Sequence, residues 1–158
     1  MPTTLAKSLR SDPISRLQLR GPVTASPNTS IEQVVRQMAE SRTGCVLLQD
    51  GSGKLIGIFT ERDFVNRVVA AGKDVAGPVG EVMTPNPKTL ARHDNVQKAV
   101  ELMGTNGYRH MPVLGDDGQP VGVLSVKEII HYLVEYFPAK VYNLPPTPDQ
   151  TQPAREGA

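Results

Sequence analysis

The run Ile56-Gly57-Ile58-Phe59 returns 65 residues later as Val121-Gly122-Val123-Leu124, and the residues on either side of each run repeat in the same order. The apolar run Val46–Leu48 precedes the first copy, and Met111–Val113 precedes the second copy at the same spacing. The two copies align without a gap, which identifies a tandem internal repeat. Such a repeat places any site that the fold creates at two related positions.

Each copy predicts the same order of secondary-structure elements. A short extended segment leads to a helix whose N-cap is Ser30 in the first copy and Asn95 in the second, both favourable capping residues. Two short strands joined by a turn rich in Gly and Asp then predict a hairpin, and a second helix follows from Glu61 or Val126. Apolar residues recur at helical spacing in the first helix of both copies: Ile31, Val34, Val35 and Met38, and Val96, Ala99, Val100 and Met103.

A single β-α-β-β-α unit of about 55 residues is too small to bury an adequate core by itself. Its helices would cover one face of the sheet and leave the other apolar face exposed. We therefore predict an α+β fold in which two β-α-β-β-α repeats pack sheet to sheet with pseudo-twofold symmetry. The predicted parts are an N-terminal lead-in (1–18), a first domain (19–72), a linker (73–84), a second domain (85–137) and a proline-rich tail (138–158) that we expect to be extended or disordered.

Composition and charge exclude several classes of function. The net charge is +1, from 17 basic and 16 acidic residues that are well mixed, so nothing favours binding to nucleic acid. Aromatic residues make up 4% with no Trp, which also argues against a stacking surface for single strands. No apolar run approaches the roughly 20 residues that span a bilayer, and the N-terminus lacks the apolar stretch of a signal peptide. We therefore expect a cytoplasmic protein without a membrane segment.

The cysteine and the histidines of the chain predict no metal site. Cys45 is the only cysteine, which rules out an intramolecular disulfide and favours a buried, inert thiol at the start of a strand. His93, His110 and His131 lack the close spacing of zinc ligands. No nucleophile, base or carboxylate pair stands out as catalytic, so we expect neither a metal nor an enzymatic activity.

A polar motif follows the second strand of the first hairpin. Gly57–Asp63, with the sequence Gly-Ile-Phe-Thr-Glu-Arg-Asp, takes the chain from a strand into the N-terminus of a helix, where unpaired N–H groups favour an anion. The Thr60 hydroxyl can face a phosphate, and the Asp63 carboxylate can accept hydrogen bonds from both hydroxyls of a ribose. The Thr-x-x-Asp spacing is also close to that of a capping box, as is Ser125-x-x-Glu128 in the second copy. The motif by itself leaves both interpretations open.

Together with the repeat, three motifs resemble those of the tandem cystathionine β-synthase (CBS) domain pair, or Bateman module. The motifs are Gly57–Asp63, Val82-Met83-Thr84-Pro85 and Tyr108-Arg109-His110-Met111-Pro112-Val113, and the resemblance covers about residues 19–137. Modules of this family bind adenosine-containing ligands in clefts between the two domains, regulate enzymes and transporters, and tend to pair into disc-shaped dimers. The resemblance implies the same properties for this chain.

The resemblance implies a first cleft in which Asp63 holds the ribose of the ligand. In this cleft Met83, Pro87 and Tyr108 would enclose the adenine, and three basic side chains would neutralise phosphates. The predicted ligand-binding residues are Ile58, Thr60, Asp63, Met83, Thr84, Pro87, Lys88, Tyr108, Arg109, His110 and Pro112.

The second cleft is predicted to be empty or to bind more weakly. Glu128 stands at the ribose-binding position and carries one more methylene than Asp, which displaces the carboxylate and makes it a poor fit to a ribose diol. Thr43-Gly44-Cys45 replaces Tyr108-Arg109-His110 and provides no cation. The residues predicted for this weaker site are Val23, Thr24, Thr43, Gly44, Cys45, Ser125 and Glu128.

We therefore expect a regulatory module that binds an adenine nucleotide, with AMP as the first choice before ADP and ATP, and signals by conformational change to a partner protein in trans. The nucleotide is a regulatory ligand, and no catalytic cofactor is expected. We also expect a homodimer, formed through excess apolar residues on the helices: Phe64, Val68, Ile129 and Leu133. Two alternatives stay open, a dimerisation scaffold that senses nothing and a module that binds another adenosyl ligand, NAD or S-adenosylmethionine.

Overall fold

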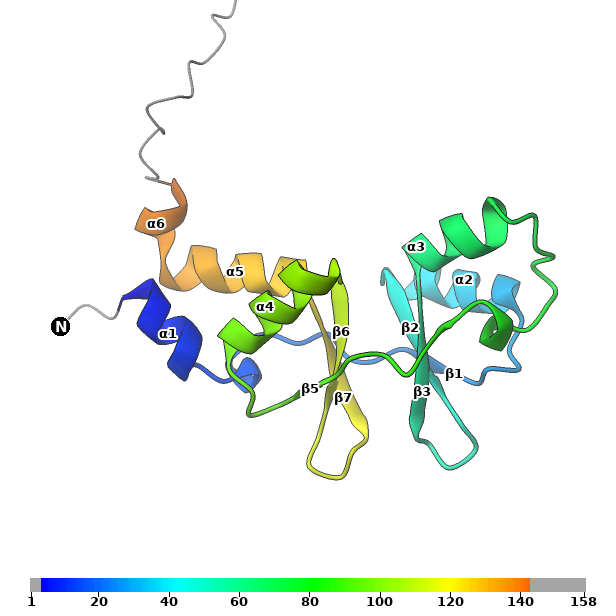
Figure 1. Ribbon diagram of the computed structural model, residues 1–158, viewed down its shortest axis with the longest axis horizontal. Helices are drawn as coiled ribbons and strands as arrows, with labels where there is room; N and C mark the ends of the chain where they lie inside the picture. Colours follow the sequence, from blue (N-terminus) through cyan, green and yellow to red (C-terminus); the bar gives the residue numbers. More distant parts are fainter. Residues whose placement is uncertain (1–3, 143–158) are drawn as a thin grey trace, which may run out of the picture.

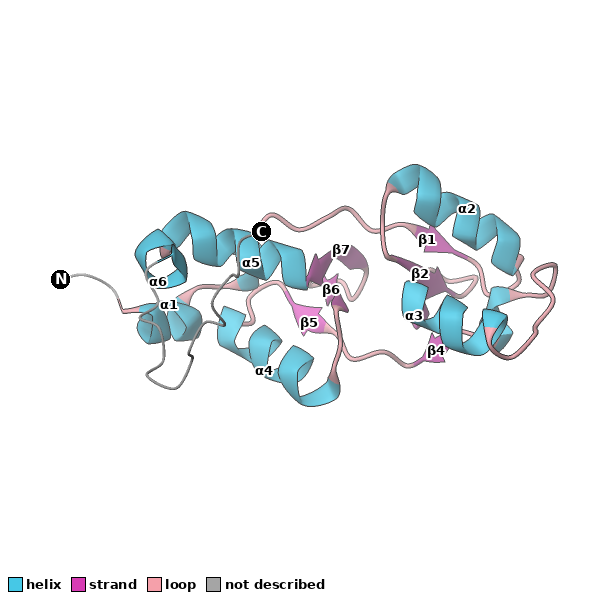
Figure 2. Cartoon of the chain, turned by 90° about the horizontal axis from the view of Figure 1, so that it is seen from above, coloured by secondary structure: helices cyan, strands magenta, loops and turns pink. Residues whose placement is uncertain are grey.

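The computed structural model describes residues 4–142 of the 158-residue chain. Two similar units lie side by side, and two segments of chain cross between them (Figures 1 and 2). The first unit contains β1 (Thr24–Ala25), α2 (Ile31–Ser41), β2 (Cys45–Gln49), β3 (Leu55–Thr60), α3 (Glu61–Asp63) with its π-helical continuation η2 (Phe64–Val69), the short helix η3 (Val79–Glu81) and β4 (Thr84–Pro85). The second contains β5 (Leu90–Ala91), α4 (Val96–Asn106), β6 (His110–Leu114), β7 (Pro120–Ser125), α5 (Val126–Tyr136) and α6 (Pro138–Tyr142).

Each unit is a small sheet covered by its own helices. In the first sheet, with the order β1-β2-β3-β4, β1 runs parallel to β2, and β2 and β3 form an antiparallel hairpin. The second sheet repeats this arrangement as β5-β6-β7. The predicted N-caps are present, because Ser30 accepts a hydrogen bond from the Gln33 N–H (3.2 Å) and Asn95 accepts one from the Lys98 N–H (2.9 Å). The predicted fold of two β-α-β-β-α repeats is thereby confirmed.

Each hairpin is extended at its edge by a segment that connects the two units. β4, at the end of the predicted linker, pairs antiparallel with β3. Arg20 makes the equivalent contact with β7 through two backbone hydrogen bonds to Val123, of 2.9 and 3.3 Å. The repeated glycines stand at these crossings, because a Cβ on Gly57 would overlap Met83 Sδ and one on Gly122 would lie 2.9 Å from the Arg20 carbonyl oxygen.

The N-terminal segment packs on the second unit, although the first unit follows it in the sequence. α1 (Leu5–Ser11) lies against α4, and Ile14 and Leu17 are buried in the core of the second unit (Figure 1). The Tyr132 hydroxyl of α5 donates a hydrogen bond to Asp12 (2.6 Å), which also forms a salt bridge with Arg16 (2.8 Å). Residues of the predicted lead-in therefore complete the hydrophobic core of the second repeat.

Apolar side chains from both sheets meet between the two units. Cys45, Leu47 and Ile58 of the first sheet form a buried cluster with Val123 of the second. This contact is the predicted sheet-to-sheet packing, with the helices of each unit on the outside (Figure 1). The Cys45 thiol lies within the contact, and burial raises its pKa to about 12. The thiol is therefore protonated and inert, as predicted.

The proline-rich tail departs from its prediction at its start. Residues 138–142 were expected to be extended or disordered, but they form the short helix α6. Proline suits the first turn of a helix, because the N–H that it lacks has no partner there. The Phe137 ring packs edge-on against Tyr132, with 5.9 Å between the ring centroids, and anchors the start of α6 to α5. The rest of the predicted tail, residues 143–158, lies outside the described residues.

Candidate functional site

The first cleft is a pocket of about 600 Å³ between the two units. β3 and α3 form one wall, β4 and the residues after it form the second, and the start of β6 forms the third. Nine of the eleven residues predicted for this cleft line it: Ile58, Thr60, Asp63, Thr84, Pro87, Lys88, Tyr108, Arg109 and His110. The fold thus brings three distant segments of the sequence to one cavity.

Asp63 forms the capping box that the sequence left open as an alternative to ligand binding. Its Oδ2 accepts hydrogen bonds from the Thr60 N–H (3.0 Å) and the Thr60 hydroxyl (3.1 Å), and Thr60 Oγ1 accepts one from the Asp63 N–H (3.2 Å). The side chain is buried, since Asp63 is only 8% exposed. Its carboxylate therefore has a fixed orientation before any ligand arrives.

The second carboxylate oxygen of Asp63 is held by weaker partners. Oδ1 accepts a hydrogen bond from the Thr84 hydroxyl of β4 (3.2 Å) and lies 3.6 Å from Arg67 Nε. Thr84 and Arg67 both line the cleft, so this oxygen belongs to the cavity side of the carboxylate. Helix capping and ligand binding are therefore compatible, because Oδ2 can cap the helix while Oδ1 binds a ligand.

Four cationic side chains line the first cleft, and two of them were not predicted. Lys88 and Arg109 were named from the sequence, and the structure adds Arg62 and Arg67 of the helix that follows β3. Arg62 donates to the Gly107 carbonyl oxygen (3.3 Å) and Arg67 to that of Met83 (2.7 Å), so both reach across to other segments. A sequence signal for Arg67 existed, because it lies one helical turn after Asp63. The carboxylates of the wall are Glu61 and Asp63, so the cleft carries an excess of positive charge.

Met83 and Pro112 were predicted for this cleft but do not lie on its wall. Met83 is partly buried, packs against the core of the first unit and fills the space above Gly57. Pro112 is buried within β6, where it pairs with Val123. Of the predicted apolar side chains, Ile58, Pro87 and Tyr108 line the cleft and can contact a flat ring, and Val65 and Pro85 line it as well.

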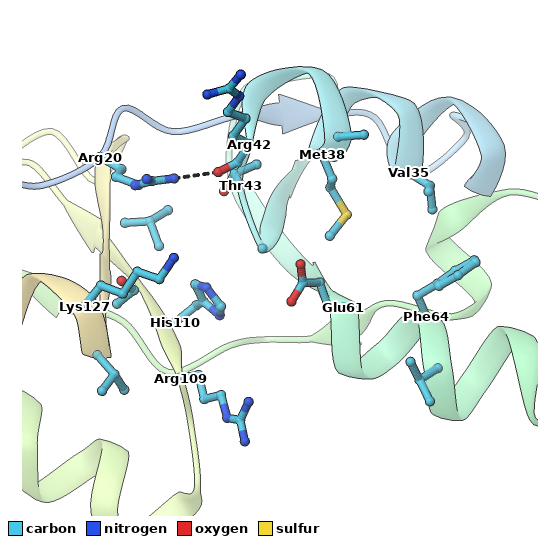
Figure 3. Close-up of a pocket in the computed structure, with 16 residues that line it drawn as sticks. Arg20, Val35, Met38, Arg42, Thr43, Glu61, Phe64, Arg109, His110 and Lys127 are labelled. Atoms are coloured by element: carbon cyan, nitrogen blue, oxygen red, sulfur yellow. Dashed lines mark hydrogen bonds between the residues drawn. The ribbon is translucent and has the colours of Figure 1, made fainter.

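A second pocket of about 640 Å³ lies between α2 and α3 of the first unit and the start of α5 in the second. We call it the helix-side pocket; Figure 3 shows its side chains. Three residues of the predicted second cleft, Thr43, Gly44 and Ser125, line it. Its complete lining is Arg20, Val35, Met38, Ala39, Arg42, Thr43, Gly44, Glu61, Phe64, Val65, Arg109, His110, Val123, Ser125, Val126 and Lys127.

The other residues of the predicted second cleft lie elsewhere. Val23 packs against the first core, Thr24 is exposed on β1 and Cys45 is buried between the sheets. Glu128 is buried and forms the second capping box, in which its Oε2 accepts hydrogen bonds from the Ser125 N–H (2.7 Å) and the Ser125 hydroxyl.

Thr43, Gly44 and Cys45 provide no cation, as the sequence indicates, but other segments bring cations to this side of the molecule. Arg20 Nε lies 3.7 Å from Glu128 Oε1, and Arg20 Nη1 donates to the Arg42 carbonyl oxygen (2.6 Å; Figure 3). Arg20 comes from the segment that crosses to β7, and Arg42 and Lys127 line the same pocket. The sequence comparison missed these residues because it considered only the positions equivalent to Tyr108–His110.

His110 stands in the wall between the first cleft and the helix-side pocket and lines both. Its ring packs against Gly44, where a Cβ would lie 2.9 Å from two ring atoms. Burial lowers the pKa of His110, and the charges of Arg109 and Lys127 act in the same direction, whereas Glu61 and Glu128 oppose the shift. The imidazole is therefore neutral at neutral pH and can gain a proton when an anion binds beside it.

Two negative findings concern the described residues 4–142. No group of three or more His, Cys, Asp or Glu side chains in this range could hold a metal ion. In the same range, no helix has the length and apolar character needed to cross a membrane.

Comparison with known proteins identifies relatives of the chain. The model of the CBS domain family matches it twice, over residues 14–70 and 79–135. A 17.7 kDa protein of Acidianus ambivalens is 28% identical over 122 residues, which cover 77% of this chain and 73% of that protein. Several other curated relatives are longer, and the chain spans between 22% and 66% of their length.

Solved structures show the same arrangement of two repeats. A CBS domain protein of Pyrobaculum aerophilum, in complex with AMP, superimposes with a TM-score of 0.71 at 29% identity and covers 78% of this chain and 97% of that one. A conserved protein of Pyrococcus horikoshii superimposes with a TM-score of 0.73 over 78% of this chain and 92% of that one. At 23% identity, the similarity to the Pyrococcus horikoshii protein supports the fold alone.

Proposed function

The chain belongs to the CBS domain family, and we propose that it is a regulatory, non-catalytic module whose first cleft binds an adenine nucleotide. The observation that carries the proposal is the meeting of a fixed carboxylate, apolar side chains and four cations in a single 600 Å³ cavity. The AMP complex of the Pyrobaculum aerophilum protein, at 29% identity, supports this class of ligand. The choice among adenosyl ligands rests on the charge of the cavity.

Each part of AMP has a chemical counterpart in the first cleft. Asp63 Oδ1 can accept hydrogen bonds from the ribose hydroxyls in place of the Thr84 hydroxyl. Pro87 and Tyr108, both half-buried, offer apolar surface to the adenine, and the cations that line the cleft can pair with phosphate oxygens. The excess positive charge favours anionic nucleotides over S-adenosylmethionine, whose sulfonium group is cationic.

Signalling would follow from the position of this cleft between the units. A nucleotide that contacts Asp63 of the first unit and Arg109 of the second bridges the two units, whose sheets also pack against each other. Binding would stabilise one relative arrangement of the units, and a partner protein that distinguishes the arrangements would sense the ligand. We propose that regulation acts on such a partner in trans.

Titration by calorimetry tests the proposal and separates it from its alternatives. We expect AMP, ADP or ATP to bind, and S-adenosylmethionine to bind more weakly because of its charge. NAD serves as a further competitor, because it carries an adenosine and two phosphates. If none of these ligands binds to the folded protein, the module is a dimerisation scaffold without a nucleotide sensor.

Nucleotide affinity should increase severalfold as the pH falls from about 8 to about 6, through the range in which histidine titrates. A phosphate beside His110 stabilises the protonated imidazole, so the pKa of His110 is higher in the complex than in the free protein. Binding is then coupled to proton uptake, and affinity rises until the pH is below the pKa of the free protein. Calorimetry in buffers of different ionisation enthalpy measures this uptake.

The matched control for proton uptake is His110→Gln. This variant keeps a polar side chain but cannot take up the proton, so only the titration of the ligand phosphate should remain. An identical pH dependence in both proteins would show that His110 does not sense the phosphate.

We also propose a homodimer, with a contact surface that differs from the one named from the sequence. Val68 and Ile129 are buried in the two cores, and Phe64 and Leu133 pack against those cores, because the helix phase turns these residues toward the sheets. Exposed apolar side chains on the second helix of each repeat include Val65 (56%) in the first and Ile130 (52%) in the second. These two residues occupy equivalent positions 65 residues apart, so they would form a symmetric apolar contact surface.

Light scattering at micromolar concentration should give the mass of a dimer, and Ile130→Asp should shift it to that of a monomer. A charge placed in an apolar interface must lose its hydration without gaining a partner, which destabilises association. Val75→Asp, at an exposed position in the turn after η2, is the control and should stay dimeric. A monomeric unmodified protein would contradict the proposal.

A further inference from the structure

Arg62 reaches across the first cleft from one unit to the other. It lies in the short helix α3, between Thr60 and Asp63, and its Nη1 donates a hydrogen bond to the Gly107 carbonyl oxygen (3.3 Å). Gly107 is the C-cap of α4 in the second unit, and both Arg62 and Gly107 line the cleft. Asp63 contacts a different wall, since it accepts a hydrogen bond from Thr84 of β4. The helix therefore presents a carboxylate to one side of the cavity and a guanidinium to another.

The Gly107 carbonyl oxygen attracts a cation because it lies at the C-terminus of a helix. The last carbonyl groups of a helix lack N–H partners and form the negative end of the helix dipole. The equivalent carbonyl 65 residues earlier, that of Arg42 at the end of α2, accepts a hydrogen bond from Arg20 Nη1 (2.6 Å). Both C-caps have left-handed backbone conformations, with φ 69° at Gly107 and φ 50° at Arg42. A guanidinium beside this carbonyl is therefore a feature of both repeats.

The two guanidinium groups differ in their carboxylate partners. Arg20 Nε lies 3.7 Å from Glu128 Oε1, so the charge of Arg20 is partly neutralised. Among the described residues, Arg62 forms no salt bridge within 4.0 Å, and neither does Arg109, which follows Gly107 on the same wall. Arg62 and Arg109 therefore bring two cations without a carboxylate partner to one part of the cleft, one from each unit.

A nucleotide held by Asp63 would direct its phosphate to this part of the cleft. The 5′ phosphate of a nucleotide lies at the opposite edge of the ribose from the 2′ and 3′ hydroxyls. If Asp63 binds the hydroxyls on the β4 side, the phosphate leaves toward the start of β6, where Gly107 and Arg109 lie. A phosphate can accept two parallel hydrogen bonds from a guanidinium, whereas Gly107 accepts a single one in an exposed contact. The phosphate is therefore the stronger partner for Arg62.

We propose that Arg62 determines the preference of the first cleft for phosphorylated adenine nucleotides over uncharged adenosyl ligands. In the free protein its guanidinium donates to the Gly107 carbonyl oxygen and connects α3 with the end of α4. When a nucleotide binds, the guanidinium exchanges this carbonyl for a phosphate oxygen. The inference rests on the proposed function of the first cleft, and it goes beyond that function by assigning phosphate recognition to a residue that contacts both units.

Titration of Arg62→Gln with AMP and with adenosine tests the assignment. We expect the variant to bind AMP about tenfold more weakly than the unmodified protein does, at the lower end of the range for a hydrogen bond to a charged group. The lower end applies because Arg62 is exposed and gives up its contact with Gly107. The affinity for adenosine should stay the same, because adenosine has no phosphate. An equal loss for both ligands would show that the contact with Gly107 only shapes the cleft, and would overturn the proposal.

Two further variants separate the role of the guanidinium from that of charge. Arg62→Lys keeps the positive charge but cannot donate two parallel hydrogen bonds, so its AMP affinity should lie between those of the unmodified protein and Arg62→Gln. Arg92→Gln is the matched control, because Arg92 is exposed and does not line the first cleft. This control removes the same charge and should retain the AMP affinity. If it weakens AMP binding as much as Arg62→Gln does, net charge explains the effect and the proposal is wrong.

The pair of ligands also distinguishes this inference from the proposed function. Asp63→Ala should weaken the binding of both AMP and adenosine, because both contain the ribose diol, whereas Arg62→Gln should weaken that of AMP alone. An unmodified protein that binds neither ligand would contradict the proposed function and this inference with it. If AMP binds to the unmodified protein and to Arg62→Gln with equal affinity, the proposed function stands and only the role of Arg62 is wrong.

Discussion

Asp63→Ala is expected to weaken AMP binding by about 10- to 150-fold, because each hydrogen bond to a charged group contributes roughly 1.5–3 kcal/mol. The carboxylate is oriented by Thr60 through Oδ2, so Oδ1 can bind a ribose without rearrangement of the helix. Calorimetric titration of the variant and the unmodified protein with AMP gives the ratio of dissociation constants.

The same substitution also costs stability, and this effect must be separated from the loss of binding. Asp63 is buried, and its removal leaves the Thr60 N–H and the Thr84 hydroxyl without their acceptor, at about 1–3 kcal/mol for a buried group. Asp63→Asn is the matched variant, because its amide oxygen keeps one acceptor while the charge is lost. Thermal unfolding of both variants establishes the temperature at which binding is compared.

The outcome decides between the two roles of the motif. A large loss of affinity in folded Asp63→Ala, with an intermediate loss in Asp63→Asn, supports ribose recognition by the carboxylate. Unchanged affinity in the folded variants would mean that Thr60-x-x-Asp63 is only a capping box.

One strong nucleotide site per chain is the second expected result, with an affinity at least about a hundredfold above that of the second cleft. In the first cleft, Asp63 lines the cavity together with four cations, and its Oδ1 accepts a hydrogen bond from Thr84, which also lines the cavity. In the second, Glu128 is turned away to Ser125 and Arg20, so the ribose-binding contact is missing. Loss of two charged hydrogen bonds to the ribose corresponds to several kcal/mol, since each contributes roughly 1.5–3 kcal/mol.

Stoichiometry and mutation together test this asymmetry. We expect one AMP per chain by calorimetry, with Glu128→Ala retaining the affinity and Asp63→Ala losing it. Two equal sites per chain would contradict the prediction, as would binding that survives Asp63→Ala but is lost in Glu128→Ala. The sequence attributed this asymmetry to two differences, the ribose-binding carboxylate and the phosphate-binding cations. Cations line both pockets in the structure, so the asymmetry depends on the carboxylate.

Much of the first cleft could be predicted because its residues lie in short motifs. Thr60 and Asp63 are three residues apart on one helical turn, and Tyr108, Arg109 and His110 are consecutive at the start of a strand. The family resemblance then supplied the pairing of these segments. Arg62 was missed although it lies between Thr60 and Asp63, because its side chain acts through a contact with Gly107 that is 45 residues distant.

The sequence by itself determined the repeat, the order of its elements and the ends of its first helices. These features depend on residues a few positions apart: apolar side chains at helical spacing, Ser30 and Asn95 at the N-caps, and glycine-containing turns between strands. Such interactions recur wherever the local sequence recurs, so an alignment of the two copies was enough to predict them.

Only the tertiary structure decided which distant segments meet. It places Arg20 beside Glu128, buries Ile14 and Leu17 in the core of the second unit, and puts Met83 over Gly57. These contacts depend on the packing of two sheets and on the paths of the crossing segments, which local periodicity does not contain. The repeated glycines show the difference, since their recurrence is visible in the sequence but the segment that crosses each of them is not.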